Sequence, residues 1–309
     1  MLVFKEIHKE RSDDMYDETF KDASIWAVFW RSILAVIGIL FLTAMLSVIF
    51  QFNHLTFLGI ISDGLLYFAF YKITLSQMRK QSLSIEALSQ PRPKGFRTLL
   101  QLSGVTVLVA IAATLFIYFA LTVLTFIPAL FDTIVNYLIS ISIGEPLSPI
   151  YILLTAVVFA PIVEEIVFRG YILNKWVDKY GISKGIWFSS LAFMILHIQS
   201  FFVPQLLLGL FCGIIYTKYK NLFYPIFIHA LYNFIVIAPS LFVQTDPMDE
   251  YAFITEITSL KHVLPTEYVV YSVIFVVLIG VLTVIFKKVT QSIPHTRSPY
   301  AENLNDLQA

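Results

Sequence analysis

Residues 151–170 read YILLTAVVFAPIVEEIVFRG, an apolar run with three charged side chains near its end. About 20 apolar residues in a helix are long enough to cross the roughly 30 Å hydrocarbon core of a bilayer. The whole chain has the same character, because 58% of its 309 residues are hydrophobic and only 14% are charged. Soluble domains have roughly 25% charged residues. We therefore expect an all-α, polytopic membrane protein.

Apolar runs of this kind recur along the chain and predict about eight transmembrane helices. The broken apolar stretch 128–147 is expected to be an interfacial or re-entrant segment. The predicted spans cover residues 25–50, 56–76, 99–127, 149–169, 184–200, 203–218, 222–243 and 267–286. The chain then divides into an N-terminal arm (1–23), three spans with the interfacial segment (24–148), a four-span core (149–243), an extracytoplasmic loop with the last span (244–288) and a polar tail expected to be disordered (289–309).

The charges predict an orientation. If eight spans alternate, 20 of the 21 Lys and Arg residues fall on one side, and only Lys261 falls on the other. Basic loops remain in the cytoplasm, so both termini are expected there, in a bacterial plasma membrane. Asp and Glu number 21 as well, so no overall basic field exists to bind nucleic acid. The single Cys212 excludes an internal disulfide and cysteine-based metal sites.

Two adjacent glutamates lie inside the fourth predicted span. Placing an ionisable side chain within a bilayer costs free energy, so each such residue is a candidate for a functional role. Glu165 and Arg169 are four residues apart on one helix face and are predicted to form an ion pair. Glu164 lies about 100° around the helix from Glu165 and has no part in that pair. Glu164 is therefore the candidate for chemistry, and a structural hydrogen bond to a neighbouring helix is the alternative.

His197 is predicted to face Glu164. If the fourth span continues through Lys179 and turns at Tyr180 and Gly181, the fifth span returns beside it. Positions 164 and 197 are equally distant from this turn, each about 25 Å from the tip at 1.5 Å per residue. The two side chains are then placed to share one water molecule.

His229 and Asn233 lie four residues apart in the seventh predicted span, on one helix face. We expect them at the same depth as Glu164 and His197, in the cytoplasmic half of the bilayer. Pro161 and Pro225 precede these groups, and each removes a backbone hydrogen bond. They are interpreted either as local openings of the helix that make room for a cavity or as ordinary packing kinks.

This set of groups suits the hydrolysis of a peptide bond without a covalent intermediate. A carboxylate and an imidazole can deprotonate a shared water, while a second imidazole and an amide donate hydrogen bonds to the oxyanion. No cofactor is required. Two His and one or two Glu also make a zinc set, but the chain has no HExxH motif, so zinc is the minority alternative. The chain also lacks GxSxG, and the isolated Asp63 is given no catalytic role.

Three motifs occur in order: EEIVFR (164–169) fits EExxxR, FMILH (193–197) fits FxxxH and HALYN (229–233) fits HxxxN. Together they resemble the CPBP (Abi) family of intramembrane proteases, which includes type II CAAX prenyl endopeptidases and bacteriocin-immunity proteins. The resemblance covers about 155–235. It implies a glutamate-dependent endopeptidase on an eight-helix core, in which the site residues are Glu164 and His197 activating water, His229 and Asn233 forming the oxyanion site, and Glu165 and Arg169 in support.

Two functions of other classes stay open. One is a non-catalytic bacteriocin-immunity or scaffold protein of the same fold. The other is a proton-coupled carrier that uses Glu164 and the histidines as a relay, although the grouping at one depth favours the protease. The expected partners are the lipid bilayer and a peptide or membrane-protein substrate. The sequence leaves the substrate and the oligomeric state open.

Overall fold

A computed structural model describes residues 18–50, 55–91, 93, 95–142, 148–197, 202–242, 255, 258–260, 264–293 and 297–308. These residues form helices, with one isolated β-bridge between Ser89 and Asn221, so the all-α class is confirmed. The elements are η1 (Glu18–Phe20), α2 (Ile25–Phe50), α3 (Leu55–Lys80), η2 (Glu86–Leu88), α4 (Phe96–Leu124), α5 (Pro128–Ser142), α6 (Pro149–Ile152), η3 (Leu153–Phe159), α7 (Ala160–Glu165), η4 (Ile166–Leu173), α8 (Asn174–Tyr180), α9 (Ile182–Leu196), α10 (Phe202–Tyr219), α11 (Phe223–Phe242), α13 (Thr266–Gln291) and α14 (Pro299–Gln308).

The chain is an integral membrane protein. Among the described residues, six helices are long and apolar enough to cross a bilayer: α2, α3, α4, the continuous run Pro149–Tyr180, α10 and α13. The helices α9 and α11 are apolar but shorter, and with them the set reaches the predicted eight. Most of their outward side chains are apolar, as lipid-facing positions require.

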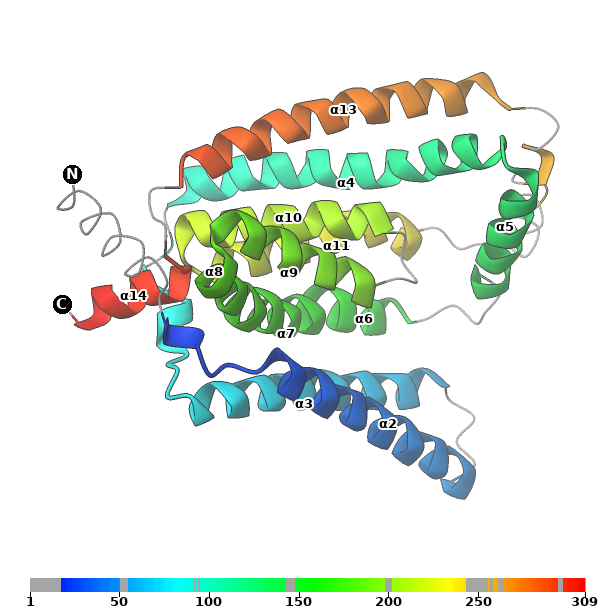
Figure 1. Ribbon diagram of the computed structural model, residues 1–309. Coiled ribbons are helices and arrows are strands. Elements are labelled where there is room, and N and C mark those ends of the chain that lie inside the picture. The colour runs from blue at the N-terminus through cyan, green and yellow to red at the C-terminus, as the bar shows by residue number, and fades with distance from the viewer. Residues whose placement is uncertain are drawn as a thin grey trace.

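The helices form layers (Figure 1). The helices α4 and α13 pack along each other, and α9, α10 and α11 lie between this pair and the run from α6 to α8. The hairpin of α2 and α3 lies on the opposite side of that run. The helix α5 crosses the far ends of α4 and α13. This arrangement encloses the fourth span, Pro149–Tyr180, between the α2–α3 hairpin and the central helices.

The fourth span departs from regular α-helical geometry on both sides of its glutamates. Leu153–Phe159 and Ile166–Leu173 are π-helical, and the short helix α7 between them carries both carboxylates. Pro161 lies in the first turn of α7, where its missing N–H disturbs the regular bonding of the preceding turn. Wider π-turns of this kind often occur at functional sites. The predicted local opening at Pro161 is therefore present.

The predicted turn between the fourth and fifth spans is also present. The helix α8 ends at Tyr180, and Gly181 follows with φ of +83°, a backbone conformation that side chains disfavour. The helix α9 then returns so closely that a Cβ atom on Gly185 would lie 2.8 Å from the backbone nitrogen of Val177. Glycine at these two positions lets the hairpin close tightly.

Two sequence-based expectations need correction. The tail is not disordered throughout, because residues 299–308 form α14, whose Tyr300, Ala301 and Asn303 are buried. Its polar composition hid this helix, whose buried residues lie in the first half and whose last turn is exposed. Pro225 lies in the first turn of α11, where proline is tolerated, and so it does not open that helix. The N-terminal arm before residue 18 and the 198–201 turn lie outside the described residues.

The described part of the N-terminal region, η1, packs against α8, while α14 packs against η2 and contacts η1 through Tyr300. We call η1, η2 and α14 together the terminal cap. Phe20 donates its N–H to Asp178, and Lys175 donates to the carbonyl of Phe20. Burial raises the pKa of the Tyr300 hydroxyl, which accepts a hydrogen bond from the N–H of Ser84. The cap thus joins segments from both ends of the chain.

Candidate active site

The centre of the site is an ion pair inside the protein. Arg169 Nη1 lies 2.9 Å from Glu165 Oε1, and both side chains are fully buried. The predicted pair is therefore present. Arg169 also donates from Nη2 to the carbonyl of Gly209 at 2.9 Å, which ties the fourth span to α10. A buried charge pair of this kind depends on further hydrogen bonds, and here they satisfy it only in part, because Glu165 Oε2 and Arg169 Nε have no hydrogen-bond partner among the described residues.

His229 joins the same carboxylate from α11. Its Nδ1 lies 2.8 Å from Glu165 Oε1. Because this carboxylate is paired with Arg169 and acts as an acceptor, Nδ1 carries the hydrogen. The Nε2 atom of His229 then points away from Glu165. Glu165 therefore sets the orientation and tautomer of the His229 imidazole, as the aspartate does for the histidine of a Ser-His-Asp triad.

His197 is oriented by the backbone of its own helix. Its Nδ1 lies 2.8 Å from the carbonyl oxygen of Phe193, which can only accept, so Nδ1 again carries the hydrogen. The Phe193 ring packs against both imidazoles, with ring centroids 4.3 Å from His197 and 5.6 Å from His229. The guanidinium of Arg169 lies over the same ring at 5.0 Å. Phe193 thus holds three site residues in place.

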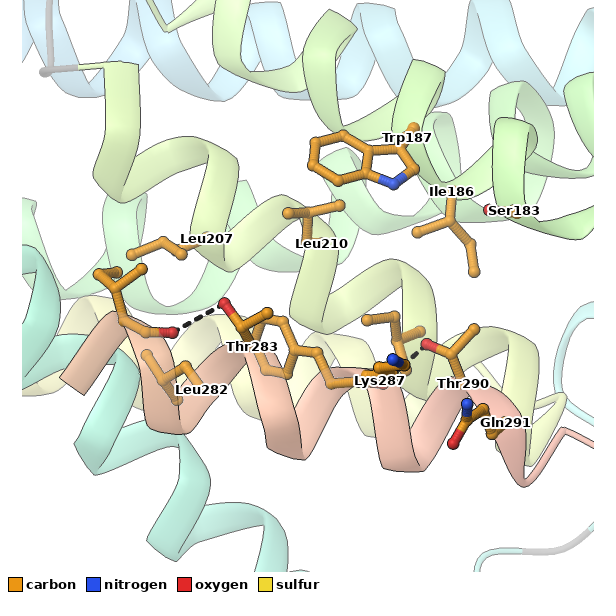
Figure 2. Close-up of a pocket in the computed structure, with 13 residues that line it drawn as sticks. Ser183, Ile186, Trp187, Leu207, Leu210, Leu282, Thr283, Lys287, Thr290 and Gln291 are labelled. Carbon is orange, nitrogen blue, oxygen red and sulfur yellow. Dashed lines mark hydrogen bonds between the residues drawn. The ribbon is translucent and has the colours of Figure 1, made fainter. Parts of the chain in front are cut away.

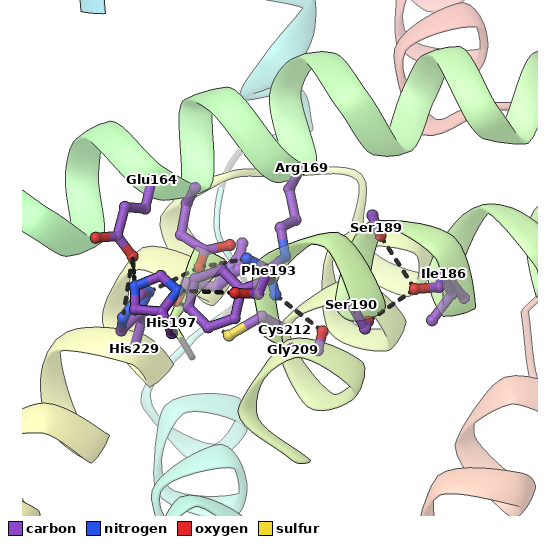
Figure 3. A network of polar contacts seen from close by, with 12 residues as sticks. Glu164, Arg169, Ile186, Ser189, Ser190, Phe193, His197, Gly209, Cys212 and His229 are labelled. Carbon is purple, nitrogen blue, oxygen red and sulfur yellow. Dashed lines mark hydrogen bonds and ion pairs between the residues drawn. The ribbon is translucent and has the colours of Figure 1, made fainter. Parts of the chain in front are cut away.

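Glu164 faces both imidazoles (Figure 3). Its Oε2 lies 3.5 Å from Nε2 of His197 and 3.8 Å from Nε2 of His229. The side chains of Glu164 and His197 are 17% and 27% exposed, whereas that of His229 is 3% exposed. The predicted meeting of Glu164 with His197 across the hairpin is therefore present. Three acceptor-capable atoms converge here, and the carboxylate oxygen lies within direct contact distance of both imidazoles.

Asn233 is placed differently from the other predicted residues. Its Nδ2 donates to the carbonyl of Ala156 in η3 at 2.7 Å. One of its two amide hydrogens is thus committed to the backbone of the π-helical stretch before Pro161. The bond also joins α11 to the fourth span, next to the helix that carries Glu164. In the structure as it stands, Asn233 stabilises the opening of that helix.

Other nucleophilic side chains nearby are committed elsewhere. Ser189 and Ser190 both donate to the carbonyl of Ile186 in their own helix. Cys212 is buried, and its sulfur lies 3.7 Å from the carbonyl of Pro225. Among the described residues, no group of three or more His, Cys, Asp and Glu side chains has the arrangement of a metal site.

A second polar group, not expected from the sequence, lies beside the site. Tyr151 of α6 donates to Asp63 of α3 at 2.6 Å, which joins the fourth span to α3. Tyr67, one turn further along α3, lies within electrostatic range of Glu164 and Asp63. The four-residue spacing of Asp63 and Tyr67 was visible in the sequence as a shared helix face. Tyr151 gave no signal, because its partner is set by helix packing.

Residues 146–235 match the family model described as "Type II CAAX prenyl endopeptidase Rce1-like". The matched segment contains all six predicted site residues and the three motifs, so the resemblance to this class of membrane protease is confirmed. No curated protein and no solved structure matches the chain.

Proposed function

We propose that the chain is an intramembrane endopeptidase that hydrolyses a peptide bond with a water activated by Glu164 and His197. The observation that carries the proposal is the position of Glu164 Oε2 at 3.5 Å and 3.8 Å from two imidazole Nε2 atoms. The family match over residues 146–235 supports a protease-type hydrolase. Glu164 is the base because the other carboxylate, on Glu165, is occupied by Arg169 and His229.

The proposed reaction follows from the hydrogen bonds at the two imidazoles. The Nδ1–H of His197 donates to the carbonyl of Phe193, and the Nδ1–H of His229 donates to Glu165. The Nε2 atom of each ring is therefore directed toward Glu164. A water bound beside Glu164 and His197 would give a proton to the carboxylate as its oxygen attacks the carbonyl carbon. The same carboxyl group then gives that proton to the leaving amine.

The oxyanion is assigned to His229 with Asn233. His229 can donate from Nε2 when its ring carries both protons, and its Nδ1 is held by the Glu165 carboxylate. Asn233 has a second amide hydrogen beyond the one given to Ala156. In a site with little water, two such donors stabilise the developing negative charge strongly.

Glu164→Gln tests the proposal. This change keeps the shape of the side chain but removes the base, so cleavage should fall by at least about 100-fold. The measurement is mass spectrometry of the termini of membrane proteins in cells that carry either form. Glu267→Gln, which removes an exposed carboxylate at the start of α13, is the matched control and should cleave normally. Full function of the Glu164 variant would instead support the immunity or scaffold role.

Metal removal separates the metal-free mechanism from the zinc alternative. We expect activity to persist after treatment with 1,10-phenanthroline, because the residues above supply a base and oxyanion donors without a metal. The purified protein should also contain well below one zinc per chain by elemental analysis. Loss of activity on chelation, with recovery on adding zinc, would replace the proposed mechanism by the zinc-dependent one.

A further inference from the structure

A groove lies away from the candidate active site, between α9, α10 and α13 (Figure 2). The helix α13 packs mainly along α4 and contacts α10 less extensively. Contacts to α10 include the stacked rings of Phe211 and Phe286, at 5.6 Å between centroids. The space left open has a volume of about 330 Å³, which is within the range of small-molecule sites.

The lining changes character along the groove. Its floor and inner walls are aliphatic and aromatic, with Leu210, Leu282 and Phe286 among them. The polar side chains gather toward one end, where Ser183 lies in the first turn of α9 and Lys287 and Gln291 lie in the last turns of α13. That end is the one nearest the terminal cap. The occupant must therefore be amphipathic, with a long apolar part and a polar head.

The polar end favours a negative charge. Lys287 and Gln291 are exposed on the last turns of α13, and none of the residues that line the groove is acidic. In the part of the chain that the structure describes, no carboxylate lies within ion-pair distance of Lys287. Thr283 and Thr290 donate to carbonyls of their own helix and are not available as donors. Lys287 is thus the main charged group of the groove.

The position of the groove also points to the bilayer. Trp187, at its rim, is 49% exposed, and tryptophan prefers the level of the lipid head groups. A lysine near the end of a spanning helix extends to the same level and attracts anionic lipid. We propose that the groove binds one anionic phospholipid, with an acyl chain along Leu210 and Leu282 and the phosphate on Lys287. The hydrolysis proposed at Glu164 does not require this lipid.

The test uses the purified full-length chain and native mass spectrometry, with equal amounts of phosphatidylglycerol and phosphatidylcholine carrying identical acyl chains. We expect retained phosphatidylglycerol to exceed phosphatidylcholine about fivefold, the ratio expected for one basic residue near the surface. Lys287→Ala should reduce this ratio to about one. Lys288→Ala is the matched control, because Lys288 is also exposed but does not line the groove, and it should keep the preference.

A second variant and a second readout locate the lipid. Leu210→Phe narrows the floor without altering charge or adding a tryptophan, and should reduce retention severalfold. Phosphatidylglycerol with brominated chains should quench the fluorescence of Trp187, measured as the difference between the native chain and Trp187→Phe. Equal retention of both lipids by the native chain would overturn the proposal. Equal effects at Lys287 and Lys288, or unchanged retention and quenching in Leu210→Phe, would overturn it as well.

Discussion

Glu165 is the residue on which most contacts of the site converge, since its Oε1 atom accepts from both Arg169 and His229. Arg169 is fully buried and depends on this carboxylate for charge compensation. We expect Glu165→Gln to lower the free energy of unfolding by about 3–5 kcal/mol, because a buried charge is left unpaired. Thermal and denaturant unfolding in detergent would measure the change.

Two further variants make this prediction specific. Glu165→Gln combined with Arg169→Met removes both charges, so its cost should be smaller than the sum of the single changes. Asp306→Asn breaks the ion pair with Lys220, in which the Asp306 side chain is 62% exposed. That control should change the stability by less than about 1 kcal/mol. Additive effects in the buried pair would mean that the two charges do not depend on each other.

Among contacts between individual residues, the sequence predicted one pair within a single helix and one pair across a helical hairpin. The pair of Glu165 with Arg169 follows from the helical repeat, and that of Glu164 with His197 follows from equal distance to the turn at Gly181. The bond from His229 to Glu165 was not predictable. It depends on how α11 is rotated against the fourth span, and helical spacing carries no information about that rotation.

At the scale of elements, the bond of Tyr151 to Asp63 is a connection between α3 and the start of the fourth span. Tyr151→Phe should lower the free energy of unfolding by about 1–3 kcal/mol, because the Asp63 carboxylate loses its hydrogen-bond donor inside the span. The midpoint of thermal unfolding in lipid nanodiscs would report it. Combining the change with Asp63→Leu should recover most of the loss, since neither partner then needs a hydrogen bond.

Tyr271→Phe is the control for this connection, because Tyr271 is a partly exposed tyrosine of α13 outside the α3 contact. It should leave the unfolding midpoint nearly unchanged. If Tyr151→Phe were equally neutral, the bond to Asp63 would contribute nothing to the attachment of α3.

For the whole molecule, Tyr300 connects parts of the chain that are far apart in sequence. Its hydroxyl accepts from the N–H of Ser84, its own N–H donates to Asn174, and its ring lies 5.1 Å from that of Phe20. Tyr300→Ala should cost about 3–5 kcal/mol, as expected for a large buried aromatic residue. Thermal unfolding and protease sensitivity of the tail would measure it.

Leu307→Ala is the matched change on the same helix, at a position that is 45% exposed, and it should have little effect. Similar behaviour of the two variants would mean that α14 is not part of the terminal cap in solution. Comparing Tyr300→Ala with Leu307→Ala also tests whether the polar tail folds as the helix α14, which the sequence did not predict. Asn303 explains why polar residues can be buried there, since its amide donates to the carbonyls of Ala87 and Lys220.

The amino-acid sequence by itself determined the all-α membrane class, the approximate positions of the helices and the pairing of Glu164 with His197. These follow from hydropathy and from the regular rise of a helix, which are local properties. Only the tertiary structure decided which acceptor holds each imidazole, where Asn233 donates, how Asp63 is satisfied and that α14 packs in the terminal cap. Each of these depends on which helices lie side by side and how they are rotated, and this is a property of the packed molecule rather than of any one segment.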